Sequence, residues 1–333
     1  MQSINHHIRK ILIIRFSSIG DIVLTSPVVR CLKLQSGAEV HYLTKRAYLP
    51  LLEANPYLDR VYSFEKKLEE VLPQLKKERY DLVVDLHKNL RSLRVRFALG
   101  VQAISFDKLN FEKWLLVNLK INRLPALHIV DRYLAAVAPL GVKNDGQGLD
   151  FFIPNSISAT PAEPIPKPPY IAFAIGAAHQ TKRLPTENLI SVCKAIKKPV
   201  VLLGGKNEEE EGAQIARFAG DHVINACGKL SLHESATVIR DAEKVIAHDT
   251  GMMHTAAAFQ KKILSVWGNT IPAFGMYPYY GNHVNENTIF EVSDLSCRPC
   301  SKIGFDHCPK GHFRCMKSQD MAAIAALANQ DET

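Results

Sequence analysis

The chain has 333 residues, a length that favours two domains over a single core. Hydrophobic residues make up 47% and charged residues 22%, which excludes a disordered or fibrous protein. The formal charge of +8 fits either an anionic partner or an ordinary basic surface, and both interpretations stay open. Because the chain has no basic tract with interleaved aromatic residues, nucleic acid is the less favoured anion.

The N-terminal stretch does not read as a targeting segment. Its apolar run at 11–16 is too short for a signal peptide and leads into "SSIGD" without a cleavage-like site. No apolar run in the sequence approaches the roughly 20 residues that span a bilayer. We therefore expect a cytoplasmic protein, and with seven cysteines and no export signal we do not expect a disulfide framework.

In the first half of the chain, short apolar runs alternate with helical patterns. The predicted strands are 11–16, 39–45, 59–64 and 81–87, and the predicted helices are 21–37, 47–58, 66–80 and 89–99. Asp21 is expected to cap the first helix, Gly37 to lie near its end, and Pro27 to kink it. Such repeated units predict a parallel sheet covered on both faces.

A proline-rich stretch at 153–170 is expected to be a linker, after which the pattern restarts. The predicted strands and their following loops are 170–178, 198–208, 222–228, 244–251 and 261–270, and the predicted helices are 186–196, 209–220, 231–242 and 252–260. The sequence therefore predicts two similar α/β domains. In such proteins, ligands bind at the carboxyl ends of the strands, in the cleft.

Two motifs in the first half carry candidate site residues. In "RFSSIGD", the small residues Ser18 and Gly20 let a ligand approach the backbone, and Asp21 follows at the helix start, where it could equally be a plain cap. The turn has neither the dinucleotide fingerprint nor the P-loop spacing, which argues against both enzyme classes. In "DLHKNLRSLRVRF", basic side chains crowd around a strand end, and Arg91 is the best candidate for an anionic acceptor. A solvated helix face is the equal alternative.

Three motifs in the second half could bind a nucleotide. In "GAAHQTKRLP", Lys182 and Arg183 could meet a phosphate, although an ordinary basic loop would look the same. In "LLGGKNEEEEG", one of four glutamates from Glu208 onward could bind a ribose; Glu208 is our candidate, but the sequence does not decide among them.

The third of these motifs, "HDTGMMHTAAAF" at 248–259, joins a strand to an Ala-rich helix. Thr250, Gly251 and His254 gather donors at the helix N-terminus, a combination that fits a diphosphate. Asp249 would be repelled by a phosphate, so it is expected to orient the loop or to accept hydrogen bonds from neutral ligand groups.

Together, "RFSSIGDIVLTSPVVRCLK", "TKRLP" and "HDTGMMHTAAAFQKKILSVWGNTIPAFGMYPY" resemble the ADP-heptose:lipopolysaccharide heptosyltransferases of glycosyltransferase family 9. The resemblance implies a GT-B fold, with an acceptor-binding domain at 1–160 and a nucleotide-sugar-binding domain at 161–318. It also implies a last helix, at 319–333, that packs back on the N-terminal domain. The acceptor would lie on the inner face of the cytoplasmic membrane, which implies peripheral contact of the protein with that surface.

The resemblance further implies an inverting transfer that needs no metal ion or other cofactor. Asp21 would be the general base, in a pocket that raises its pKa toward neutrality, and Ser18, Gly20 and Arg91 would meet the acceptor. The implied donor ligands are Lys182, Glu208, Asp249, Thr250, Gly251 and His254. Before Lys182 stand Ala177, Ala178 and His179, where some heptosyltransferases have hydroxyl residues.

The C-terminal cysteines are a weak candidate for a structural zinc site. Cys297 and Cys300 have the Cys-x-x-Cys spacing, but Cys308 and Cys315 are spaced more widely than in most zinc knuckles. Reduced thiols packing a compact segment are the favoured alternative. Two other functions stay open: transfer of another sugar by the same fold, and binding of a nucleotide sugar without turnover.

Overall fold

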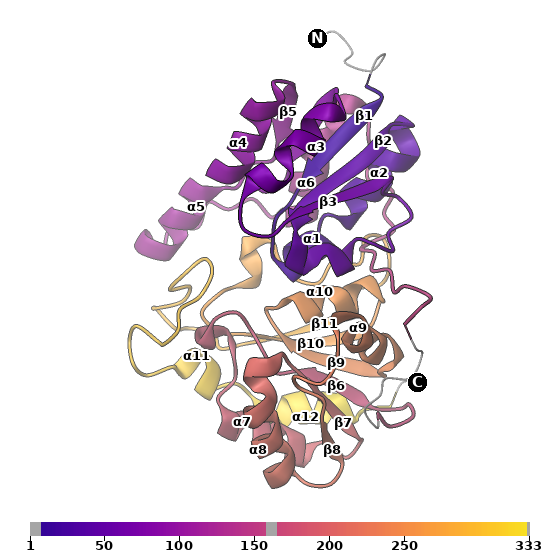
Figure 1. The fold of residues 1–333 in the computed structure, drawn as a ribbon. Helices are drawn as coiled ribbons and strands as arrows, with labels where there is room; N and C mark the ends of the chain where they lie inside the picture. The colour runs from indigo at the N-terminus through magenta and orange to yellow at the C-terminus, as the bar shows by residue number, and fades with distance from the viewer. Residues whose placement is uncertain (1–7, 158–164, 332–333) are drawn as a thin grey trace. The chain divides into compact units, whose positions relative to one another are not determined.

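The computed structural model describes residues 8–157 and 165–331, which form two compact units of α/β structure (Figure 1). Unit 1 comprises Met1–Lys108, Leu127–Pro154 and Tyr279–His283. Unit 2 comprises Leu109–Ala126, Asn155–Pro278 and Val284–Thr333. Each unit thus takes one segment from the half of the chain that the sequence assigned to the other. Residues 158–164 of the expected linker lie outside the described residues.

Unit 1 is built on a five-stranded parallel sheet in the order β3-β2-β1-β4-β5. Its strands are β1 (Lys10–Ile14), β2 (Glu39–Lys45), β3 (Arg60–Phe64), β4 (Leu82–Asp85) and β5 (Gln102–Ser105). The central strand β1 is a run of apolar residues, fully buried from Ile11 to Ile14, as expected for a strand covered on both faces. Because all strands are parallel, their carboxyl ends meet at one edge of the sheet.

The helices of unit 1 are α1 (Ile19–Val23), α2 (Ser26–Ser36), α3 (Leu72–Lys77), α4 (Leu90–Leu99) and α6 (Ile129–Val137). A 3₁₀ helix, Arg46–Leu51, follows β2. The single helix predicted at 21–37 is two helices, because Pro27 cannot donate a backbone hydrogen bond and is tolerated only in the first turn of α2. Ser18, and not Asp21, is the N-cap of α1. Gly37 ends α2 with φ of 67°.

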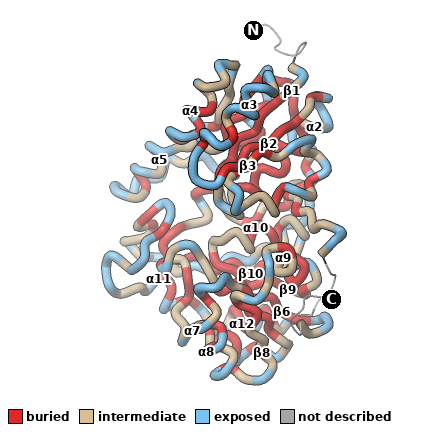
Figure 2. Tube along the Cα trace, in the orientation of Figure 1, coloured by how far each residue is buried: buried red, intermediate tan, exposed pale blue. Residues whose placement is uncertain are grey.

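Unit 2 is built on a six-stranded parallel sheet in the order β11-β10-β9-β6-β7-β8. Its strands are β6 (Ile171–Ala174), β7 (Val200–Leu203), β8 (Val223–Asn225), β9 (Lys244–His248), β10 (Lys262–Trp267) and β11 (Asn287–Glu291). Its helices are α5 (Asn110–Trp114), α7 (Thr186–Ala195), α8 (Glu209–Ala219), α9 (Leu232–Asp241), α10 (Gly251–Ala258), α11 (Arg314–Lys317) and α12 (Met321–Asn329). Buried residues follow both sheets (Figure 2).

The last helix, α12, packs within unit 2, whereas the sequence analysis expected it on the N-terminal domain. Its apolar face, with Ile324 and Ala328, is buried in the same core cluster as residues of β6 and α7. The ammonium group of Lys244 donates to the carbonyl oxygen of Leu327 over 2.8 Å. The side chain of Asn329 donates to the carbonyl oxygen of Ala195, the last residue of α7, and accepts from the backbone nitrogen of Lys197. An Ala-rich helix fits this position because small side chains allow close packing on α7.

No helix in the described ranges is both long enough and apolar enough to cross a membrane.

Candidate active site

The loop after β1 holds Asp21 at the carboxyl edge of the first sheet. Asp21 lies in the first turn of α1, and its Oδ2 accepts hydrogen bonds from the backbone nitrogen and hydroxyl of Ser18, at 3.2 and 2.9 Å. Its Oδ1 pairs with a guanidinium nitrogen of Arg15, the residue that follows the strand, at 2.6 Å. The local sequence produces this arrangement because a serine cap and an acid three residues later stabilise a helix start together.

The positive charge of Arg15 keeps Asp21 in its ionised form. The buried guanidinium also donates to the carbonyl oxygens of Ser17 and Leu86, at 2.8 and 2.6 Å, and to the hydroxyl of Tyr133. Burial alone would raise the pKa of Asp21, but the charge of Arg15 and the hydrogen bonds from Ser18 outweigh it, so the pKa is lowered. The expected rise toward neutrality is therefore wrong for the protein without ligands, because a buried cation lies against the acid.

Most charged residues in and around the loop after β4 form hydrogen bonds within the protein that hold this loop in place. Asp85 is buried and accepts hydrogen bonds from the backbone nitrogens of His87 and Lys88, and from the hydroxyl of Ser92. The ammonium group of Lys88 donates to the carbonyl oxygen of Phe106. Burial, followed by the charge of Arg15, lowers the pKa of His87 to about 3, so its ring is neutral at physiological pH.

Two of the three arginines of α4 have acidic partners. Arg94 pairs with Glu69, and Arg96 lies 3.9 Å from Asp85. Arg91 is exposed and makes no hydrogen bond or ion pair with another described residue. It is therefore the member of this basic group that is available to an anion.

In unit 2, the pair Lys182–Asp249 lies at the carboxyl edge of the second sheet. The ammonium nitrogen of Lys182 lies 2.7 Å from Oδ2 of Asp249, which also accepts a 2.8 Å hydrogen bond from the hydroxyl of Thr270. These three residues follow β6, β9 and β10, which are far apart in the sequence and carry their loops to one edge. Asp249 thus steadies the loop around Lys182, one of the two roles expected for it.

The helix α10 starts beside this pair. Thr250 is its N-cap, and the hydroxyl oxygen of Thr250 is buried without a hydrogen-bond partner among the described residues. His254, one turn further on, is buried. His248, which sequence reasoning left without a role, accepts a hydrogen bond at Nε2 from the backbone of Leu184; burial lowers its pKa to about 3, so it stays neutral and anchors the lysine loop.

The acidic run after β7 is tied to Arg183. Oε1 of Glu208 lies 3.0 Å from that guanidinium, and Oε2 accepts from the backbone nitrogen of Gly205 at 2.8 Å. Glu211 pairs with the other side of the guanidinium and with Thr186. Arg183 therefore does not stand free for a phosphate, as the sequence suggested it could. Glu208 is the buried acid of the run, held in a fixed orientation.

Sequence reasoning also missed a support for the Thr270 loop. The buried guanidinium of Arg298 donates to the carbonyl oxygens of Gly268 and Thr270, at 2.5 and 3.0 Å, and pairs with Glu291 at 2.7 Å. Arg298 stands within the motif "CRPC", in which only the cysteines were candidates for a function. Gly268 and Thr270 lie 30 and 28 residues away in the sequence, so no local pattern could have found these two contacts. Beside it lies a hollow of about 610 Å³ that contains none of the predicted donor residues.

The cysteines of this segment are free thiols, and they do not gather as metal ligands. Cys315 is buried in the core of unit 2, and burial raises its pKa to about 12. Sγ of Cys297 lies 3.8 Å from Nε2 of His312. Among the described residues, these thiols form no group of three or more ligand atoms that all lie within 4.8 Å of one another, and the weak zinc candidate stays a prediction.

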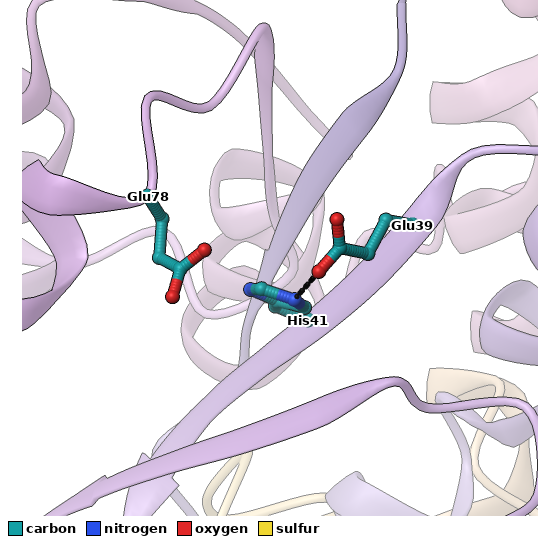
Figure 3. Close-up of side chains that lie close together, drawn as sticks. All are labelled: Glu39, His41 and Glu78. Carbon is teal, nitrogen blue, oxygen red and sulfur yellow. Dashed lines mark hydrogen bonds and ion pairs between the residues drawn. The ribbon is translucent and has the colours of Figure 1, made fainter.

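Within the described residues, the ligand atoms that do gather within 4.8 Å belong to Glu39, His41 and Glu78 (Figure 3). Figure 3 shows His41 between the two carboxylates, and its Nε2 lies 2.7 Å from Glu39. Both acids also pair with the ammonium group of Lys10, at 3.2 and 2.6 Å. A metal would have to displace this cation, so the group is an ion-pair network at the amino edge of the first sheet.

The two parallel sheets place the protein in a known class. The structure of Escherichia coli ADP-heptose lps heptosyltransferase II matches with a TM-score of 0.66 at 19% identity, covering 96% of this chain and 100% of that one. A glycosyl transferase family 9 protein from Veillonella parvula matches with a TM-score of 0.68 at 21% identity, covering 84% and 85%. The fold is therefore GT-B, as predicted.

Residues 69–306 match the model of glycosyltransferase family 9 (heptosyltransferase), and the chain belongs to that family. Lipopolysaccharide heptosyltransferase 1 of Campylobacter coli is 24% identical over 290 residues, covering 78% of this chain and 84% of the relative. Its namesake from Pseudomonas aeruginosa is 25% identical over 323 residues, covering 88% and 86%.

Proposed function

We propose that this protein transfers a heptose from ADP-heptose to the lipopolysaccharide inner core or a related acceptor, with inversion and without a metal ion. The observation that carries the proposal is Asp21, held as an oriented carboxylate at the carboxyl edge of the first sheet in a chain of this family. Its named relatives act on lipopolysaccharide, and a solved structure of similar fold is Escherichia coli heptosyltransferase WaaC with ADP-2-deoxy-2-fluoro heptose.

In the proposed reaction, Asp21 takes the proton of the attacking acceptor hydroxyl. A carboxylate of lowered pKa is a weak base, but the hydroxyl proton becomes acidic as its oxygen bonds to the anomeric carbon, so the proton moves late. The anomeric carbon loses its bond to the phosphate oxygen on the opposite face, and ADP leaves with that electron pair. We assign the exposed Ser18 to the acceptor beside Asp21, with Gly20 buried behind it in α1, and Arg91 to the acidic groups of the acceptor.

The leaving diphosphate needs positive charge and hydrogen-bond donors. Lys182 supplies the charge. Its ammonium group has three donors, of which Asp249 engages two, through its carboxylate at 2.7 Å and its backbone carbonyl oxygen at 3.5 Å, so one donor is left for a phosphate while the loop keeps its shape. The N-terminus of α10 at Gly251 and the unpartnered hydroxyl of Thr250 add donors, and His254 stands one turn further. Glu208 is assigned to the ribose hydroxyls.

The direct test is release of ADP from ADP-heptose in the presence of EDTA and a delipidated inner-core acceptor. The expected result is release that depends on the acceptor and is unaffected by the chelator. Binding of ADP without release would contradict the donor or the acceptor, and would favour another nucleotide sugar or a protein that only binds one. Release that EDTA abolishes would contradict the metal-independent mechanism.

A further inference from the structure

The outward face of α4 is apolar and exposed. Leu90, Leu93 and Phe97 are 85%, 36% and 78% exposed, and their spacing of three and four residues places them on one side of the helix. The opposite side, with Ser92 and Val95, is buried. Burying a leucine or phenylalanine against other protein is favourable, so a helix that turns three of them outward indicates a partner.

The same helix is positively charged. Its ten residues include Arg91, Arg94 and Arg96, and no acidic residue. Helix α5 also exposes large apolar residues, Phe111 and Trp114. Its five residues include one acid and one base, so α5 itself carries no excess of positive charge. An apolar stripe flanked by arginines is the composition of a helix that lies in the interface of an anionic bilayer.

The position of α4 links this face to the proposed acceptor site. The helix begins just after β4, at the sheet edge that also holds Asp21. Arg15 pairs with Asp21 and also donates to the carbonyl oxygen of Leu86, in the loop that leads into α4, so the base and this loop share one anchor. A glycan attached to a lipid that contacts α4 would therefore lie close to the carboxylate of Asp21.

We propose that the outward face of α4 docks on the surface of a bilayer that carries anionic lipids. Leu90, Leu93 and Phe97 enter the headgroup layer, and Arg91 lies among the lipid phosphates, while Arg94 keeps its pair with Glu69. The proposal names the surface through which the proposed function reaches a lipid-anchored acceptor, and it rests on that function for its biological purpose. The binding itself requires neither donor nor acceptor.

The test is sedimentation of the full chain with vesicles of phosphatidylethanolamine and phosphatidylglycerol, and with vesicles of phosphatidylcholine. We expect binding to the anionic vesicles and little to the neutral ones. The double variant Leu90→Ser, Phe97→Ser should weaken anionic vesicle binding roughly tenfold or more, because the apolar contacts are lost. The matched control is Leu34→Ser, Phe218→Ser, which removes two exposed apolar side chains from α2 and α8 and should bind like wild type.

Three results would overturn the proposal: no binding of the wild-type chain to anionic vesicles, equal binding by the α4 double variant, or equal weakening by the control variant. A change in oligomeric state of the α4 variant on size-exclusion chromatography would instead assign the face to a second copy. ADP release with a delipidated acceptor should be unchanged in the α4 variant. Absence of that release in wild type would contradict the proposed function and leave the vesicle result standing.

Discussion

Each unit places an aspartate against a basic side chain at the carboxyl edge of its sheet, but the two pairs are built differently. In unit 1, the guanidinium of Arg15 is buried and donates to two backbone carbonyl oxygens besides Asp21. In unit 2, the ammonium group of Lys182 stands on a flexible stem and pairs with Asp249, which Thr270 steadies. The base of the first pair is therefore fixed by the backbone around it, whereas the ammonium group of the second pair has polar contacts, among the described residues, with Asp249 alone.

From this difference we expect the largest effect on catalysis from the substitution Asp21→Asn. The amide keeps the size of the side chain, but it has a single acceptor oxygen, so it can accept from Ser18 or from Arg15 and not from both, and it cannot take a proton. We expect kcat to fall by about 10³-fold or more while donor binding stays within a few-fold of wild type. The matched control is Asp59→Asn, because Asp59 also pairs with a basic residue, Lys33, and accepts a backbone hydrogen bond, from Val40. An Asp21→Asn variant with full activity would remove Asp21 as the base.

The lowered pKa of Asp21 also predicts the pH profile. The group stays ionised below its usual range, so kcat/KM should remain level from about pH 8 down to about pH 5. A raised pKa would instead give a loss of activity as the pH falls through neutrality. A limb near pH 6 to 7 that moves to higher pH in a variant of Arg15 would show that Asp21 titrates there after all, because loss of the cation raises the pKa of the acid.

The second largest effect is predicted for Lys182→Ala. The variant removes the cation proposed to hold the diphosphate and leaves Asp249 as an unpaired acid beside it. We expect KM for the donor to rise between about tenfold and a hundredfold, with kcat reduced as well. Lys33→Ala breaks a lysine–aspartate pair of similar length, 2.6 Å, outside the site and should leave KM unchanged. Equal effects of the two variants would mean that Lys182 acts only on stability.

The sequence predicted the elements around both pairs well, because continuous apolar runs followed by small residues mark buried parallel strands. It missed β5 and β11, which lie at sheet edges, are only partly buried and have no such run. It located the motifs that hold Asp21 and Asp249, because parallel strands bring their following loops to one edge. It could not find the partners: Arg15 bonds Leu86, and Arg298 bonds Thr270, through contacts that only the folded chain creates.

A smaller effect is predicted for Arg298→Ala. The guanidinium holds the loop of Gly268 and Thr270, and Thr270 steadies Asp249, so its loss should loosen the second pair without removing any member of it. We expect KM for the donor to rise several-fold and the free energy of unfolding to fall by about 2 kcal/mol. A stability loss with KM unchanged, measured well below the unfolding temperature, would separate this anchor from the donor site.

The smallest effect on catalysis is predicted for a third paired carboxylate, Glu78, at the opposite edge of the first sheet. Its hydrogen bonds with Lys10 and then with Tyr62 lower its pKa to about 2. It pairs with Arg60 as well, at 2.9 Å, and with Lys10 it closes the network around His41. Lys10, Glu39 and Arg60 each begin a strand, so this network lies at the amino edge, away from the loops that carry the proposed site.

Glu78→Gln should therefore leave kcat and KM unchanged while it lowers stability. A carboxyl group whose pKa is lowered by folding contributes stability above its unfolded pKa, near 4.5, and loses that contribution as the pH falls toward 2. We expect the free energy of unfolding to drop by about 1 kcal/mol at pH 7, a value reduced by solvent screening, and the difference from wild type to shrink below pH 4. Denaturant melts at pH 7 and pH 3 check this. A variant equally destabilised at both pH values would show that Glu78 contributes through packing, and an altered rate would show that the two edges of the sheet are coupled.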